Sequence, residues 1–83
     1  MKLHYLKTWP DEFQAVLDRR KKHEFRKNDR GFGVGHRLVL QEWDPIKQDY
    51  TRREREVQVT YISRGPDYGI PDGYCVMSIF VPV

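Results

Sequence analysis

Apolar residues recur at helical intervals near the start of the chain, directly after a short alternating segment at residues 4–8. The residues of this apolar stripe are Trp9, Phe13, Val16 and Leu17. Their spacing is typical of one face of an amphipathic helix. Thr8 is a candidate N-cap, and Pro10 suits the first turn. The pattern therefore predicts one main helix over about residues 9–20.

Much of the remaining chain alternates with the period of two that strands show. The alternating segments are residues 22–27, 36–43, 51–63 and 74–81. Within residues 51–63, Val57, Val59 and Tyr61 are expected on one side. One helix beside a small, mostly antiparallel sheet predicts a mainly β or α+β fold, a compact β-barrel with the helix packed next to it. Without a repeat or a linker, residues 1–83 are expected to form a single domain.

Two segments rich in glycine read as turns. Gly31, Gly33 and Gly35 precede a strand pattern, whereas a dinucleotide-binding fingerprint follows a strand and opens a helix. Phe32 and Tyr68 lie within such loops and are the aromatic residues expected to be exposed.

The cysteine count and the apolar runs limit the class of protein. Cys75 is the only cysteine among the 83 residues, so no intrachain disulfide can form, and a reducing, cytoplasmic location is expected. No apolar run approaches the roughly 20 residues that span a bilayer, so no membrane partner is expected. Cys75 falls inside a predicted strand, which favours a structural role over a nucleophilic one.

The His and Cys residues that could bind a soft metal ion lie far apart in the sequence. They are His4, His23, His36 and Cys75, and none has the paired spacing of structural zinc sites. We therefore expect neither a metal nor a cofactor.

Positive charge is concentrated in residues 19–30, named here the basic block. It contains seven Lys or Arg and two acidic residues, a local balance of +5, whereas the whole chain carries +3. Cations in the last turn of the predicted helix would offset its dipole, which explains Arg19, Arg20 and Lys21 in part. The block indicates either a site for an anion or a solvated face, and the sequence leaves both open.

Within the block, Glu24 and Arg26 are predicted to share one side of a strand, with Phe25 pointing to the core. Lys21 lies just upstream. A cationic cluster with one carboxylate inside it can bind phosphate, while the carboxylate orients a base or a hydroxyl. Neighbouring cations favour the ionised carboxylate, which makes it a poor general acid but a possible base.

Two segments carry a family resemblance. They are "EFRKNDR" at residues 24–30 and "LQEWDP" at residues 40–45, preceded by a helix that ends in a Lys-rich turn. The combination resembles a small bacterial and phage family related to the ASCH domain, in the PUA-like superfamily, over nearly the whole chain. Arg19 stands where the family usually has glycine, and His36 where it usually has Asp.

The resemblance implies a PUA-like β-barrel with a helix beside it and RNA or a nucleotide as partner. The residues expected to line the binding cleft are Lys21, Glu24, Arg26, Lys27 and Arg30. Some ASCH proteins hydrolyse acetylated cytidine with a Lys, a Thr and a Glu. Lys21 matches the lysine, Glu24 stands at the threonine position, and the catalytic glutamate has no match. The alternative is therefore a small amidohydrolase acting on an acetylated nucleoside, with Lys21 and Glu24 as catalytic candidates. A third hypothesis is a structural or host-interaction protein.

Overall fold

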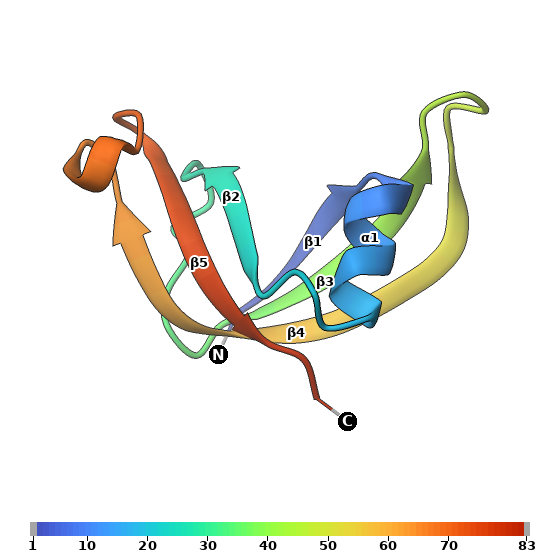
Figure 1. Cartoon of the computed structure of the whole chain (residues 1–83), viewed down its shortest axis with the longest axis horizontal. Helices are drawn as coiled ribbons and strands as arrows, with labels where there is room; N and C mark the ends of the chain where they lie inside the picture. Colours follow the sequence, from blue (N-terminus) through green and yellow to red (C-terminus); the bar gives the residue numbers. More distant parts are fainter. Residues whose placement is uncertain (1, 83) are drawn as a thin grey trace.

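The computed structural model describes residues 2–82 as one curled sheet that forms a half-barrel with a single α-helix (Figure 1). In chain order the elements are β1 (Leu3–Thr8), α1 (Pro10–Leu17), β2 (His23–Lys27), β3 (Arg37–Asp44), β4 (Asp49–Arg64), the short 3-10 helix η1 (Asp67–Gly69) and β5 (Tyr74–Phe80). The predicted mainly β class with one main helix is confirmed for the described residues. Met1 and Val83, the ends of the predicted domain, lie outside them.

The strand order across the sheet is β1-β3-β4-β5-β2. β1 pairs with β3 in parallel, and every other pairing is antiparallel. β1 and β2 are therefore the two edge strands. The sheet curls so that these edges rise on either side of the half-barrel, with α1 beside β1 (Figure 1). The curl brings β1 and the start of α1 close to the basic block on and around β2.

The inner face of the half-barrel forms the hydrophobic core. Its fully buried strand residues include Leu38, Leu40, Val57, Val59 and Met77, and α1 adds Phe13 and Val16. Burying such side chains contributes roughly 1.5–3 kcal/mol each. The predicted alternation of β3 and of the middle of β4 is correct, since Leu38, Leu40, Val57 and Val59 all lie in this core.

The helix is shorter than predicted. It ends at Leu17, and Arg19 adopts a left-handed backbone with φ of 60°. Arg20 N and Lys21 N both donate to Ala15 O after this reversal. The three cations therefore follow the helix instead of occupying its last turn. Left-handed backbone suits glycine, which agrees with the residue that the resembled family usually has at this position.

The predicted N-cap is also wrong. Trp9 occupies the N-cap position without a side-chain bond, and Thr8 is the buried last residue of β1. Thr8 Oγ1 donates to Leu6 O at 3.3 Å. Because strand β1 runs directly into α1, the hydroxyl group faces the interior instead of the free amides of the helix.

Two further predictions about exposure are wrong, and one is confirmed. Phe32 is buried, since it packs edge-on against His4 with ring centroids 4.8 Å apart. Tyr61 is exposed because a β-bulge between Val59 and Tyr61 turns it away from the core side. Tyr68 in η1 is 89% exposed, as predicted.

Candidate functional site

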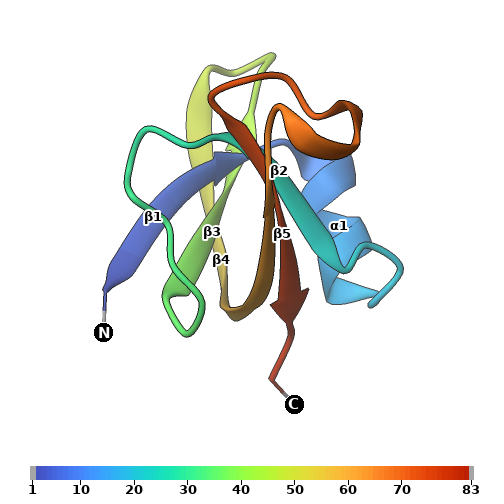
Figure 2. The same ribbon diagram turned by 90° about the vertical axis from the view of Figure 1, so that its left-hand side faces the viewer.

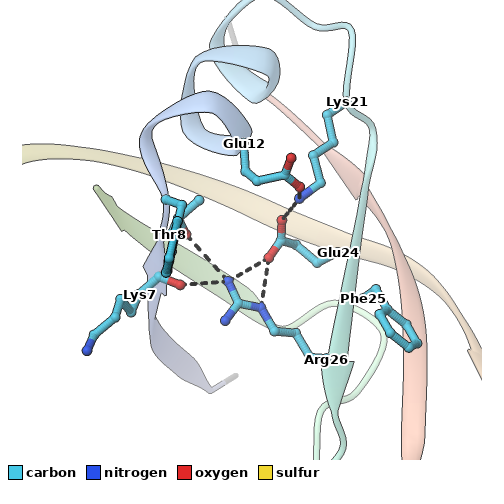
Figure 3. Close-up of a pocket in the computed structure, with 8 residues that line it drawn as sticks. Lys7, Thr8, Glu12, Lys21, Glu24, Phe25 and Arg26 are labelled. Carbon is cyan, nitrogen blue, oxygen red and sulfur yellow. Dashed lines mark hydrogen bonds and ion pairs between the residues drawn. The ribbon is translucent and has the colours of Figure 1, made fainter. Parts of the chain in front are cut away.

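A pocket of about 360 Å³ opens where the end of β1, the start of α1 and strand β2 meet (Figure 3). We call it the cleft. Its lining residues are Lys7, Thr8, Trp9, Glu12, Lys21, Glu24, Phe25 and Arg26. They come from two stretches of chain on the opposite edges of the sheet, so only the curl of the half-barrel brings them together.

Glu24 forms the floor of the cleft and is 1% exposed. Lys21 Nζ donates to Glu24 Oε2 at 2.9 Å, and Arg26 Nε donates to Glu24 Oε1 at 2.9 Å (Figure 3). Both carboxylate oxygens therefore have a cationic donor. A buried carboxylate is tolerated only when it is paired in this way, because an isolated charge in the interior is strongly unfavourable.

The prediction for β2 is half correct. Glu24 and Arg26 do share a side, and it faces the cleft as predicted, but Phe25 is 50% exposed instead of buried. Phe25 stacks on Tyr74 of β5 outside the half-barrel, with ring centroids 5.5 Å apart. Glu24 can occupy the inner position because Lys21 and Arg26 neutralise it, and Phe25 must then point outward.

Lys21 connects the two carboxylates of the cleft. Its Nζ lies 2.8 Å from Glu12 Oε1 and 2.9 Å from Glu24 Oε2. Burial alone would lower the pKa of Lys21, but the hydrogen bond to Glu12 and the charge of Glu24 outweigh it, so the pKa is raised. The hydrogen bond from Lys21 lowers the pKa of Glu12. Lys21 therefore acts as a fixed cation and hydrogen-bond donor, and it is poorly suited to act as a base.

Arg26 reaches from β2 across the open side of the half-barrel to β1. Its Nη2 donates to Lys7 O at 3.0 Å and approaches Thr8 Oγ1 at 3.4 Å (Figure 3). Arg30 Nη1 donates to Tyr5 O in the same way. Both accepting carbonyls belong to β1, an edge strand of the sheet. The two arginines thus join β2 and its following loop to β1 through side chains, where no backbone pairing exists.

The residues expected to line one cleft occupy two neighbouring hollows. Lys21, Glu24 and Arg26 meet in the cleft, whereas Lys27 and Arg30 line an adjacent hollow of about 170 Å³ that shares Arg26. The other cations of the basic block point elsewhere. Arg20 pairs with Asp18 at 3.2 Å, and Arg19 and Lys22 lie beside the end of β5.

Sequence reasoning did not assign Lys7, Thr8, Trp9 and Glu12 to the cleft. Trp9 was placed in the apolar helical stripe, yet it is exposed because it precedes the first helical residue. Glu12 lies in the first turn of α1, but its partner Lys21 lies beyond the far end of the helix. No local signal in the sequence brings β1 next to β2.

A second buried carboxylate lies under α1. Glu42 Oε1 accepts from Thr51 Oγ1 at 2.7 Å and lies 3.6 Å from Arg53 Nη1. Arg53 also donates to Gln14 of the helix at 3.1 Å. The group ties α1 to the β3–β4 hairpin, which is a structural role.

Other chemistry is not indicated in the part of the chain that the structure describes. Between residues 2 and 82, no three His, Cys, Asp or Glu side chains gather as a metal site would require. Cys75 is buried, and burial raises the pKa of its thiol, as expected for an unreactive cysteine. None of the described helices is long and apolar enough to cross a membrane.

Comparison with known proteins places the chain in a family. The family model described as "Domain of unknown function (DUF3850)" matches residues 3–79, which include every residue of the cleft. The chain belongs to the DUF3850 family. It is also 34% identical over 67 residues to an uncharacterized 12.9 kDa protein encoded in the GpA 3′ region of Escherichia phage P2. The match covers 81% of this chain and 60% of the phage protein, so the chain spans less than two thirds of that relative.

Proposed function

We propose that this chain binds RNA or a nucleotide in the cleft. The observation that carries the proposal is the arrangement of Lys21 and Arg26 around the buried Glu24 at the floor of an open pocket. A solvated face does not require a fully buried carboxylate with two cationic partners. The geometry is that of a pre-organised polar site, which holds its donors in place before a ligand arrives.

Donor groups remain for a ligand. Lys21 has three N–H groups and uses them toward two carboxylates. Arg26 bonds through Nε and Nη2, and its Nη1 makes no hydrogen bond within residues 2–82. Phosphate oxygens or the carbonyl groups of a base could accept from these groups, and charge-assisted bonds of this kind are among the stronger ones.

The charge of the cleft suits one phosphate better than a long anionic chain. Its lining includes the cations Lys7, Lys21 and Arg26 and the carboxylates Glu12 and Glu24, a net charge of +1. Trp9 offers an exposed ring at the same cleft, and base–aromatic stacking contributes roughly 1–3 kcal/mol per base. We therefore favour a single nucleotide unit in the cleft.

We further propose that the half-barrel is PUA-like and related to the ASCH domain. The support is the curled sheet with one helix at its side, together with the "EFRKNDR" and "LQEWDP" segments. Glu24, Arg26 and Arg30 of the first segment make the contacts that hold the cleft and its edge together. The "EFRKNDR" segment therefore has a structural role in this chain in addition to its resemblance to the family.

The second candidate is hydrolysis of an acetylated nucleoside. Lys21 between two carboxylates and the Thr8 hydroxyl at the same cleft favour it. However, the raised pKa of Lys21 keeps it protonated, and both oxygens of Glu24 are occupied. A general base for attack on an amide is therefore not evident in the cleft, and binding is the better supported function.

Calorimetric titration with uridine 5′-monophosphate tests the proposal. Lys21→Gln removes one of the three cations of the cleft, and Arg26→Lys keeps the charge but removes the guanidinium fork. Lys47→Gln, an exposed lysine in the β3–β4 turn, is the matched control. We expect the two cleft variants to weaken binding about tenfold each, the cost of one charge-assisted bond, and the control to have no effect. Release of acetate from N4-acetylcytidine would instead favour the hydrolase.

A further inference from the structure

Aromatic side chains stand together on the outer face of β4, β5 and β2. They are Phe25, Tyr61, Tyr74 and Phe80, and all are exposed. The register pairs that place them on one face are Phe25 with Val76, Lys27 with Tyr74, Tyr61 with Ser78, and Gln58 with Phe80. β5 lies between β4 and β2 in the sheet (Figure 2). We call this surface the aromatic face.

Two of the rings stack on each other, and a third joins the same face. Phe25 and Tyr74 are nearly parallel, with an interplanar angle of 24° and ring centroids 5.5 Å apart. The β-bulge in β4 inserts Thr60 and so brings Tyr61 onto this face, where it is 65% exposed. Bulges commonly re-aim a side chain near a functional surface.

Positive charge lies at both ends of the aromatic face, and the register pairs that define it include no Asp or Glu. Glu56, the next outward residue of β4, is paired with Arg37 at 2.7 Å. The face residues other than the aromatic ones are His23, Lys27, Gln58, Ser63, Val76 and Ser78. Next to Phe80, Arg19 and Lys22 border a hollow of about 220 Å³. Among the basic-block cations outside the cleft, Lys27 lies on this face, and Arg19 and Lys22 lie beside its Phe80 end.

We propose that the aromatic face binds single-stranded RNA. Single strands are held by rings on which bases stack and by cations that follow the backbone, and exposed aromatic residues on a sheet are an established way to do so. Polar residues such as Ser63 and Ser78 separate the rings, unlike the apolar centre of a stable protein interface. The occupant favoured by ring spacing and charge is therefore a nucleic acid strand.

Phe25 links the face to the cleft, because it belongs to both. A strand lying across β5 and β2 could place one nucleotide in the cleft and stack its neighbours outside. The inference deepens the proposed function by naming a single strand as the ligand, and it rests on that function only for the nucleotide in the cleft.

Fluorescence anisotropy with labelled U8 RNA, alongside calorimetry with uridine 5′-monophosphate, tests the inference. Tyr61→Leu and Tyr74→Leu remove a ring while keeping apolar bulk. Tyr68→Leu is the control, since Tyr68 is even more exposed but lies in η1, off the face. We expect each face variant to weaken U8 binding at least about 5-fold, the loss of one stacked base. The control and the affinity for the mononucleotide should not change.

Unchanged U8 affinity in both face variants, or no U8 binding by the wild type, overturns the inference, and mononucleotide binding then still supports the cleft. If the wild type binds U8 in a way that depends on Tyr61 but does not bind the mononucleotide, the aromatic face is supported and the cleft proposal is contradicted. A dimer of the wild type seen by light scattering that is lost in Tyr61→Leu, without U8 binding, would mean that the occupant is a second copy and overturn the inference.

Discussion

Glu24 and Arg26 stand two residues apart on β2, and both side chains turn into the cleft, where Arg26 Nε donates to Glu24 Oε1 at 2.9 Å. The same guanidinium donates to Lys7 O on β1. One arginine therefore holds the carboxylate and closes the edge of the half-barrel. This double role ties the stability of the fold to the shape of the cleft, and the first prediction follows from it.

Replacing Glu24 with Ala should destabilise the protein by about 2–4 kcal/mol, because Lys21 and Arg26 would lose a buried partner. Urea denaturation measures this change. Glu56→Ala is the matched control, since Glu56 pairs with Arg37 on an exposed strand surface at 2.7 Å. The control should cost less than about 1 kcal/mol. Equal effects of the two substitutions would show that burial of Glu24 contributes nothing.

The ion pair between Glu12 and Lys21 should limit stability at both ends of the pH scale. The pKa of Glu12 is lowered from an ordinary 4.5, so its contribution is present above that pH and is lost as the pH falls. The pKa of Lys21 is raised from an ordinary 10.5, so its contribution is present below that pH and is lost as the pH rises. Glu12→Gln should flatten the acid limb of a stability–pH curve, and an unchanged acid limb would contradict the assignment.

His4 should add a separate loss of stability on mild acidification. Burial and then the charges of His36, Lys2 and Arg30 lower the pKa of His4 from its ordinary 6.5. Because Gly33 N already donates to His36 Nδ1, His4 Nε2 is the donor in the 3.1 Å bond between the two rings. Because the pKa of His4 is lowered, its contribution is present above pH 6.5 and is lost as the pH falls below it, so His4→Gln should reduce the slope of stability against pH on the acid side of pH 6.5. An unaltered slope would exclude His4 as the source.

Cys75 should be protected from thiol reagents in the folded protein. It is fully buried between Tyr74 and Val76 on β5, and its pKa is raised. Reaction with Ellman's reagent should therefore be limited by unfolding and should accelerate when urea is added. Immediate reaction of the native protein would contradict the placement of β5.

Salt should weaken the binding of the two proposed ligands, uridine 5′-monophosphate and U8 RNA, to different extents. Each neutralised phosphate contributes about −0.7 to the slope of log K against log salt for single strands. The basic block is divided between the cleft, the Arg26 and Arg30 contacts to β1, and the aromatic face. We expect a shallow slope for the mononucleotide, which has no condensed counterions to release, and a steeper one for U8. Equal slopes would contradict this division.

The sequence predicted the architecture well because Leu38, Leu40, Val57 and Val59 are both apolar and periodic. It also predicted that Glu24 and Arg26 share a side. It could not predict which side faces inward, because the burial of Glu24 depends on Lys21 and Arg26 reaching it together in three dimensions.

Other errors have a similar origin. The predicted helix was too long because nothing in the local sequence indicates the left-handed backbone at Arg19. Tyr61 was assigned to the wrong face because a bulge shifts the alternation by one residue. Half of the cleft was missed because Lys7, Thr8 and Trp9 meet β2 only through the curl of the sheet.

The central claim is that a nucleotide occupies the cleft, and a titration of ¹⁵N-labelled protein with uridine 5′-monophosphate tests it most directly. We predict that the Trp9 indole and Arg26 Nε signals shift together and saturate, because both residues line the cleft. The amides of η1 should not move, since η1 lies outside the cleft. Saturable shifts confined to other surfaces, or none at either Trp9 or Arg26 at millimolar nucleotide, would contradict the account.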